Sequence, residues 1–360
     1  MKHCKKCLLP QSYPGADIDV HGICNFCRNK DKKDDLYSPD KLKIRQDDLA
    51  QAIANAKGVG PYDALVALSG GKDSIYLLYK LKVEMGLRVL AMTTDMNLPD
   101  IAWDNIRRTV DKLDVDLVTI RPERDFYRRM FTYLLKNQEG GGAVRTVCYV
   151  CAPLFESDAI RLATDRGIPL VLAAYAPGQP EPERMLYEFS RKMIENFDWT
   201  PPELKNSGLF SPRELERFWN PHAYPQGTKF PRYLAPFHAW EYSQEEVMKK
   251  VVELGLIIDS KHANPIHSNC PVNWLLMYSD LKNLGYNPYN PEFSNLIRSG
   301  KANLTYWKFA LPVVNFMIRN QLLLGKNVKK TFDWLGITAS DLKITRQAGT
   351  IGVDPSLKRG

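Results

Sequence analysis

Apolar positions along residues 39–174 follow two alternating patterns. Short apolar runs, typical of buried strands, are separated by longer segments in which apolar residues recur every three or four positions, as on one face of a helix. The runs predict strands at 63–68, 87–94, 117–120 and 169–174. The periodic segments predict helices at 39–57, 72–84, 100–113, 123–138 and 154–166. This alternation predicts an α/β fold with a doubly wound parallel sheet, in which ligands bind beyond the carboxyl ends of the strands.

The pattern changes after the last of these strands. Residues from about 176 to 236 are rich in proline, aromatic and charged residues, and we interpret them as an insertion that faces the substrate and is long enough to carry helices of its own. Ser243-Gln244-Glu245-Glu246 is a capping box, which predicts a helix that ends near Leu254. A glycine hinge is expected at 140–142, and residues 276–360 are predicted to be mainly helical.

The composition is that of a globular protein. Of the 360 residues, 44% are hydrophobic and 25% charged, and no segment approaches the roughly 18 apolar residues of a membrane span. The basic start of the chain is not followed by an apolar segment, so no secretory signal is predicted. We therefore expect a cytoplasmic protein without a membrane partner. The net charge of +8 and the pI near 9.0 favour polyanionic ligands such as ATP, a nucleotide-sugar or RNA, unless they reflect only a basic solvated surface.

One loop has the composition of a phosphate site. Ser69-Gly70-Gly71-Lys72-Asp73-Ser74 follows the first predicted strand and leads into a helix. Its glycines allow a tight turn whose N–H groups point at phosphate oxygens, and the helix N-terminus adds partial positive charge. Lys72 supplies a full charge, and Ser69 and Ser74 offer hydroxyl donors. The common mononucleotide loop, GxxxxGK followed by Ser or Thr, does not fit because Asp73 follows the lysine. The alternative is a strand-to-helix turn without a ligand.

The loop resembles that of the PP-loop ATP pyrophosphatases, also called adenine nucleotide alpha hydrolases, whose SGGxDS loop holds the pyrophosphate of ATP. The resemblance implies that an acceptor oxygen attacks the α-phosphorus, which gives an adenylated intermediate. It also implies that Thr94 and Asp95 contact adenine and ribose. Mg²⁺ would accompany ATP, with Asp73 either near the ion or capping its own helix. Lys72 and Asp73 are therefore predicted to be catalytic.

Four cysteines near the N-terminus have the spacing of a metal site. Cys4-x-x-Cys7 and Cys24-x-x-Cys27 enclose 16 residues, a spacing typical of a tetrahedral zinc ribbon with ligands Cys4, Cys7, Cys24 and Cys27. This segment has too few large aliphatic residues to fold by burial alone, so we expect Zn²⁺ to hold it together. Two disulfides are the alternative, which the absence of a secretory signal does not favour.

The other three cysteines are candidates for a second centre. Cys148-x-x-Cys151 and the distant Cys270 resemble the active-site trio of tRNA thiolation enzymes of the same superfamily. Three thiolates can hold three corners of a [4Fe-4S] cluster and leave one iron open for a ligand such as hydrosulfide. The alternative is three buried cysteines that never meet, because cysteine is often buried for packing alone.

Several segments resemble the N-acetyl sugar amidotransferases of bacterial surface-polysaccharide biosynthesis. They are CKKCLLP at 4–10, GICNFC at 22–27, YDALVALSGGKDSIYLLYKL at 62–81 and LIRSG at 296–300. The resemblance implies that an acetamido group on a nucleotide-activated sugar becomes an acetamidino group, with ammonia supplied by a separate glutaminase. The chain departs from this family at 173–179, where a stretch bearing tryptophan and glutamate is replaced by AAYAPGQ.

Three functions therefore compete. Adenylation followed by ammonia transfer is favoured, and sulfur transfer to a tRNA base or a small molecule, through a [4Fe-4S] cluster, is the alternative. A zinc-ribbon protein that binds nucleotide or RNA without turnover is the third. The oligomeric state stays open, with a homodimer as one option. The predicted domains are a zinc ribbon at 1–35, a linker helix at 36–60, the ATP pyrophosphatase domain at 61–275 and the helical C-terminal region at 276–360.

Other residues have weaker claims. His262 and His267 could act as acid or base, although exposed loop histidines are the simpler interpretation. Glu181, Glu183 and Arg184 follow a predicted strand and could line the substrate pocket. The aromatic segment 230–240 could stack on a base or sugar, although such residues more often belong to a core.

Overall fold

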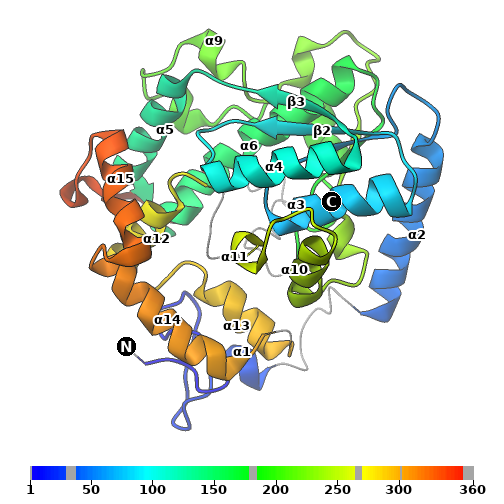
Figure 1. Ribbon diagram of the computed structural model, residues 1–360. Helices are drawn as coiled ribbons and strands as arrows, with labels where there is room; N and C mark the ends of the chain where they lie inside the picture. Colours follow the sequence, from blue (N-terminus) through cyan, green and yellow to red (C-terminus); the bar gives the residue numbers. More distant parts are fainter. Residues whose placement is uncertain (1, 30–37, 178–184, 264–269, 301, 352–360) are drawn as a thin grey trace.

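A five-stranded parallel sheet forms the centre of the computed structural model, which describes residues 2–29, 38–177, 185–263, 270–300 and 302–351 (Figure 1). The strand order is β3-β2-β1-β5-β6, with every neighbouring pair parallel. The strands are β1 (Ala64–Ala67), β2 (Val89–Thr94), β3 (Asp116–Ile120), β5 (Leu170–Leu172) and β6 (Arg232–Leu234). Strands β2 and β3 lie on one side of β1 in the sheet, and β5 and β6 lie on the other side. This confirms the predicted α/β fold with a parallel sheet.

Alternate strand residues pack on opposite faces of the sheet. Ala64 and Val66 of β1 belong to the core on one face, whereas Leu65 belongs to the core on the other face. The first face is covered by α2 (Pro39–Ala56), α3 (Lys72–Tyr79), α4 (Asp100–Leu113) and α10 (Gln244–Glu253). A π-helical segment, η2 (Lys80–Glu84), continues α3. The second face is covered by the C-terminal half of α6 (Gly142–Asp165). Strands β1, β2 and β5 are buried on both faces, which explains their continuous apolar sequences.

The segment interpreted as an insertion also contributes to the sheet. Strand β6 pairs with β5 through Tyr233 and Leu234, which are fully buried. Three short helices precede it: α7 (Arg191–Asn196), α8 (Pro202–Lys205) and α9 (Pro212–Leu215). Buried Trp199 and Trp219 pack with Tyr233 on the sheet, so much of the aromatic content of this segment serves the core. The sequence did not predict β6, because a three-residue strand does not show a period.

Helix α6 is longer than the sequence predicted. A helix starting at Leu154 was wrong, because α6 begins at Gly142 and includes both Cys148 and Cys151. Its first turn is capped from another part of the chain, by the buried carboxylate of Asp280, which accepts hydrogen bonds from the N–H groups of Ala143 and, at 3.1 Å, Val144. A Cβ on Gly142 would lie 2.4 Å from that carboxylate, and the φ of Gly142 is +93°. The glycine run therefore starts a helix rather than forming a hinge.

The C-terminal region is mainly helical, as predicted. It contains α12 (Asn273–Asn283), α13 (Asn290–Arg298), α14 (Leu304–Arg319) and α15 (Lys326–Leu335). Helices α12, α14 and α15 share a second core with α5 (Arg124–Lys136) and with the N-terminal half of α6. The sequence missed a short parallel pair, β4 (Gln138–Glu139) with β7 (Ile344–Arg346). None of the helices described here is long and apolar enough to cross a membrane.

The remaining short elements connect these layers. They are α1 (Asn25–Arg28), η3 (Pro221–Ala223), η4 (Pro236–His238), α11 (Ser260–Ala263), η5 (Leu323–Gly325) and η6 (Ala339–Asp341). The predicted cap of α10 is confirmed, since the Ser243 hydroxyl accepts a hydrogen bond from the N–H of Glu246 at 3.3 Å.

Asp280 makes the stability of the fold depend on pH. Burial raises the pKa of its carboxyl from 3.8 to about 7, so between these values the folded state binds a proton that the unfolded state has released. The free energy of unfolding should therefore fall as pH rises from about 4 to about 7, by up to about 1.4 kcal/mol per pH unit. Asp280→Asn cannot titrate and should lack this contribution. Urea unfolding of both proteins across this pH range tests it, and a difference in stability that does not change with pH would contradict it.

Candidate active site

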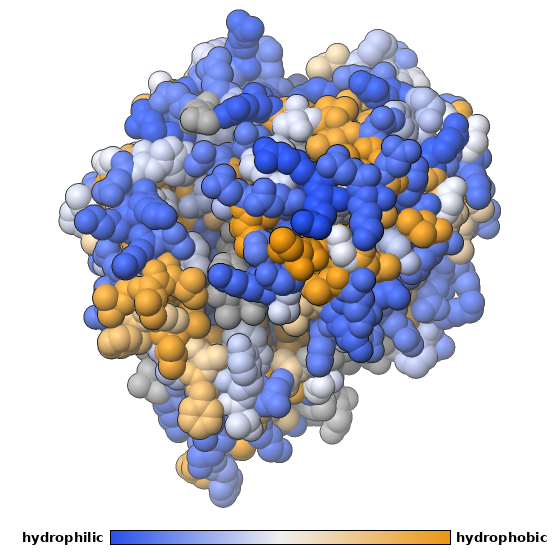
Figure 2. Space-filling view, viewed as in Figure 1, coloured by the Kyte–Doolittle hydropathy of each residue, from blue (hydrophilic) through white to orange (hydrophobic). Residues whose placement is uncertain are grey.

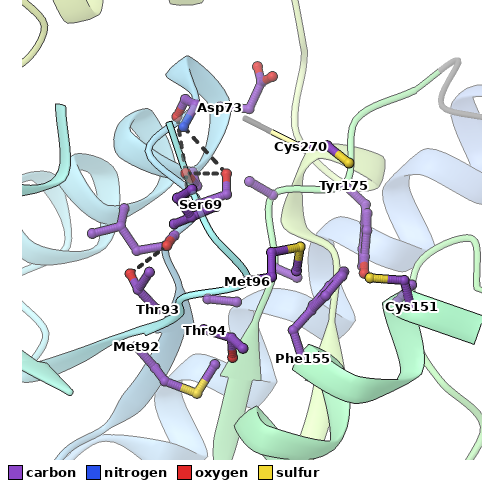
Figure 3. A pocket seen from close by; sticks show the side chains of 18 of the residues that line it. Ser69, Asp73, Met92, Thr93, Thr94, Met96, Cys151, Phe155, Tyr175 and Cys270 are labelled. Carbon is purple, nitrogen blue, oxygen red and sulfur yellow. Dashed lines mark hydrogen bonds between the residues drawn. The ribbon is translucent and has the colours of Figure 1, made fainter. Parts of the chain in front are cut away.

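The Ser69–Ser74 loop joins β1 to α3 and is closed by its own hydroxyl groups (Figure 3). The N–H of Ser69 donates to Ser74 Oγ at 3.2 Å, and Ser74 Oγ donates to the carbonyl of Gly71 at 3.0 Å. Because α3 begins at Lys72, the N–H groups of its first turn have no acceptor within their own helix. The loop therefore presents backbone donors and a positive helix end toward the space beyond β1.

Gly70 fixes the loop against helix α4. Its φ is +78°, and a Cβ at this position would lie 2.5 Å from the carbonyl oxygen of Ala102. The side-chain amide of Asn105 donates to the Gly70 carbonyl at 3.0 Å. A side chain at position 70 would therefore push the loop away from α4, which explains the first glycine of the motif.

Lys72 and Asp73 form a charged pair at the start of α3. Lys72 is only 7% exposed, and its Nζ donates to Asp73 Oδ2 at 2.6 Å. The hydroxyl of Tyr242 donates to the other carboxylate oxygen, Asp73 Oδ1, at 2.8 Å. Burial, with the nearby charge of Asp73, raises the pKa of the Tyr242 hydroxyl, which stays a donor at neutral pH. Both carboxylate oxygens of Asp73 thus accept hydrogen bonds from side chains. A role of Asp73 in binding Mg²⁺ stays a prediction.

The loop and three distant cysteines line one cavity of about 470 Å³. Ser69, Lys72 and Asp73 lie on one wall, and Cys148, Cys151 and Cys270 also line the cavity. Figure 3 shows Cys151 on its helix and Cys270 on a separate segment, both across the space from Ser69. Other lining residues include Thr94 of β2, Phe155 of α6, Tyr175 after β5, and His262. The fold therefore brings both sequence-predicted groups to a single site.

The cysteine trio is placed by two elements of the second core. Cys148 and Cys151 are one helical turn apart on α6, and Cys270 precedes α12. All three pack in the same hydrophobic cluster, and none of the seven cysteines is in a disulfide. Burial raises the pKa of the Cys270 thiol to about 11, and burial together with the charge of Cys270 raises that of Cys151 well above 9.0. Thiolates here would therefore need a positive centre beside them.

Thr94 and Asp95 differ in their environments. Thr94 lines the cavity, and its hydroxyl donates to the buried Asp158 at 2.9 Å. The carboxylate of Asp95 accepts hydrogen bonds from the N–H groups of Asn97 and Leu98, at 3.0 and 3.2 Å. It also lies 3.4 Å from Arg121 Nε. Asp95 therefore holds the turn after β2, and Thr94 is the member of the pair that lies at the cavity.

The N-terminal cysteines form a second, separate cluster. The sulfur atoms of Cys4, Cys7, Cys24 and Cys27 all lie within 4.8 Å of one another. The Sγ–Sγ distance is 3.8 Å for Cys4–Cys27 and 3.6 Å for Cys7–Cys24. A tetrahedral ion with bonds of about 2.3 Å separates its sulfur ligands by about 3.8 Å, so the four thiols have the spacing of one metal site. Among the described residues, no other group of three or more His, Cys, Asp or Glu side chains has its ligand atoms this close together.

The C-terminal helix α13 contacts this cluster directly. Arg298 Nη1 donates to Cys7 Sγ at 3.2 Å, and Ile297 packs against the core of the ribbon. The guanidinium of Arg298 also lies over the ring of Phe26, 5.7 Å from its centre. Figure 1 shows this N-terminal segment beside α13. The N-terminal cysteine segment is therefore packed on α13, and Arg298 places positive charge beside the Cys7 sulfur.

No protein-family model and no curated protein sequence matches the chain. Among solved structures, the chain resembles an NMN synthetase from Francisella tularensis, at 11% identity over 87% of this chain and 99% of that one. It also resembles a U34-tRNA thiolase with its [4Fe-4S] cluster from Methanococcus maripaludis, at 12% identity over 96% and 90%. A third is an NH₃-dependent NAD synthetase from Campylobacter jejuni, at 12% identity over 82% and 97%. Each TM-score is 0.35, which is too low to assign a family.

The structure also places residues that sequence reasoning ranked low or missed. His262 Nδ1 lies 2.7 Å from Asp259 Oδ1 at the edge of the cavity, whereas His267, Glu181, Glu183 and Arg184 lie outside the described residues. A smaller cavity of about 210 Å³ adjoins Lys72 and Asp73 and is also lined by Tyr242 and Glu292. Burial raises the pKa of the Glu292 carboxyl to about 7. Neither residue belongs to a recognisable motif, so no sequence signal marked them.

Gly70→Ala should destabilise the protein more than Gly58→Ala does. Gly58 has a similar φ of +82° but open space where a Cβ would go, so Gly58→Ala measures the cost of the backbone conformation alone, about 1 kcal/mol. Gly70→Ala adds the clash with Ala102 and should cost about 2–4 kcal/mol. Urea unfolding of both variants provides the comparison. Equal costs would show that the loop moves away from α4 without penalty.

Proposed function

We propose that the protein is an ATP-dependent enzyme that adenylates a carbonyl or amide oxygen of its acceptor and then replaces that oxygen. The observation that carries this proposal is the shared cavity of about 470 Å³, where the phosphate-type loop lies opposite three cysteine thiols. A loop that only bound nucleotide would not require reactive side chains across the same space. A cysteine cluster that served packing alone would not require the loop.

The loop residues account for the first step. The pyrophosphate portion of ATP would accept hydrogen bonds from the first-turn N–H groups of α3. The positive charge of Lys72 would attract the same phosphate oxygens. The acceptor oxygen then attacks the α-phosphorus, the bond between the α- and β-phosphates breaks, and pyrophosphate leaves. Tyr242 and Lys72 hold the carboxylate of Asp73 at the loop, where it would meet Mg²⁺. In the second step, AMP leaves with the acceptor oxygen as a nucleophile takes its place.

The cysteine trio supports sulfur as the incoming atom. Cys148 and Cys151 project from one face of α6, because residues three apart in a helix are neighbours, and Cys270 comes from a separate segment. Thiolates in this arrangement would hold three irons of a [4Fe-4S] cluster, which supplies an open iron that can bind hydrosulfide. A cluster spaces its cysteine ligands more widely than a single ion does, since each binds a different iron. The acceptor would be a tRNA base or a small carbonyl compound.

Ammonia is the second candidate for the incoming atom. Two of the segments that resemble N-acetyl sugar amidotransferases meet in the fold, since Arg298 of LIRSG donates to Cys7 of CKKCLLP. This contact favours a function that uses the ribbon and α13 as one unit. The acceptor would then be a nucleotide-activated sugar, with a separate glutaminase as the source of ammonia. We propose Zn²⁺ for the ribbon in both cases, because four thiolates at tetrahedral spacing suit that ion.

Lys72→Met should slow turnover strongly while leaving the fold intact. Loss of a charge at the transferring phosphates typically lowers the rate about 10²–10³-fold. Formation of AMP and pyrophosphate from ATP would be measured with nucleotide-sugars, tRNA and ammonium or sulfide supplied in turn. Lys57→Met, at an exposed position after α2, is the matched control and should retain full activity. ATP binding without AMP formation under every condition would instead support the non-catalytic alternative.

Metal analysis after anaerobic purification should distinguish the two centres. We expect one zinc per chain and, for sulfur transfer, about four irons with matching sulfide. Cys7→Ser should lose zinc and destabilise the ribbon, whereas Cys270→Ser should lose iron and keep zinc. Zinc without iron in the wild-type protein would rule out the cluster and leave ammonia as the nucleophile. Incorporation of labelled sulfide or labelled ammonium into product then identifies the incoming atom directly.

A further inference from the structure

Helix α14 is apolar on two opposite faces. On one face, Leu311 and Ile318 are buried, and Ile318 packs in the C-terminal core. On the other face, apolar residues recur at spacings of three and four, so they form one stripe along the helix. Each is between 52% and 69% exposed: Tyr306, Phe309, Val313 and Phe316. A helix on the protein surface normally presents polar side chains on the face that points away from the core, so this exposed apolar stripe is unusual.

Two residues after the helix extend this surface. Leu322 and Leu323 are 48% and 73% exposed, and with the stripe they make up what we call the α14 patch: Tyr306, Phe309, Val313, Phe316, Leu322 and Leu323. Of the 13 large hydrophobic side chains exposed on the described residues, these are six. Figure 2 shows apolar side chains gathered at the lower left, over the C-terminal helices. A concentration of this kind marks an interaction surface.

The surroundings of the patch are basic. The 40 residues from Phe293 to Phe332 contain seven Lys and Arg residues and no Asp or Glu. Five of these basic residues are exposed on α14 and α15, within or just after the chain segment of the patch: Lys308, Arg319, Lys326, Lys329 and Lys330. The partner must therefore combine an apolar interior with a negatively charged surface.

A second copy of the chain and a nucleic acid both fit this surface poorly. Two-fold pairing of α14 helices about Val313 would bring Lys308 of one copy close to Arg319 of the other, and these like charges would repel. A nucleic acid supplies negative charge, but Val313, Leu322 and Leu323 are aliphatic and cannot stack on bases as aromatic rings do. An anionic bilayer satisfies both requirements, because phosphate headgroups meet the basic residues and the apolar side chains enter the interface.

We propose that the α14 patch attaches the protein peripherally to an anionic lipid bilayer. The sequence predicted no membrane partner because no segment can span a bilayer, and the patch replaces that expectation with a surface contact. The proposal does not depend on the reaction proposed above, since no residue of the patch lines either cavity.

Co-sedimentation of the full-length protein with vesicles tests the proposal. Vesicles of phosphatidylcholine mixed with phosphatidylglycerol should bind the wild-type protein, and vesicles of phosphatidylcholine alone should not. The triple variant Phe309→Ser, Val313→Ser, Phe316→Ser should lower the partition coefficient at least about tenfold. The matched control is Ile44→Ser, Val83→Ser, Leu209→Ser, whose residues are 67%, 53% and 50% exposed elsewhere on the molecule. It should change binding by less than about twofold.

Three outcomes would overturn the proposal. They are no binding of the wild-type protein to anionic vesicles, an equal loss in the control variant, and unchanged vesicle binding in the patch variant. If light scattering also shows that the patch variant converts a dimer to a monomer, a second copy covers the patch instead. Unchanged thermal unfolding by circular dichroism verifies the fold of both variants. Lys329→Glu with Lys330→Glu gives an independent route, since it should weaken binding to anionic vesicles without altering the apolar stripe.

Discussion

The first turn of α6 rests on the carboxylate of Asp280, and the geometry of the site depends on this contact. The 24-residue helix packs in two cores, with Val150 in the C-terminal core and Ile160 in the sheet core. At 1.5 Å per residue it is about 36 Å long, enough to connect both. Asp280 lies on α12, which begins three residues after Cys270. The pair α6 and α12 therefore positions all three cysteines of the cavity, although they are far apart in sequence.

The charges around the loop are nearly balanced before any ligand binds. Lys72 is paired with Asp73, and Glu292 lies close enough that Lys72 lowers and Asp73 raises its pKa. An anionic ligand would add negative charge to this group. The balance would then be restored by a divalent cation at Asp73 or by a proton on Glu292. If the site binds a nucleotide, as we propose, this requirement is a physical reason for Mg²⁺ to bind with it.

Features set by local patterns could be predicted from the sequence. The buried strands, the helix after the loop and the Ser243 cap depend on periodicity and on side chains a few residues apart, and the structure contains each of them. The metal-type cluster at Cys4 to Cys27 depends only on spacing. In contrast, the start of α6 depends on Asp280, more than 130 residues away, and no local signal marks it. The residues Tyr242 and Glu292 were missed for the same reason, because tertiary packing alone places them, whereas strand β6 was missed because it is too short to show a period.

The contact between Arg298 and Cys7 has a consequence for how the two ends of the chain communicate. Arg298 and Glu292 lie on the same nine-residue helix, α13, so the ribbon and the cavity beside Lys72 share one rigid element. If an ion bound to the N-terminal cysteines stabilises one position of α13, it also stabilises the corresponding position of Glu292 beside the loop. Such coupling is reciprocal by thermodynamic necessity, so occupancy of the loop would change the affinity of the ribbon for its ion by the same factor.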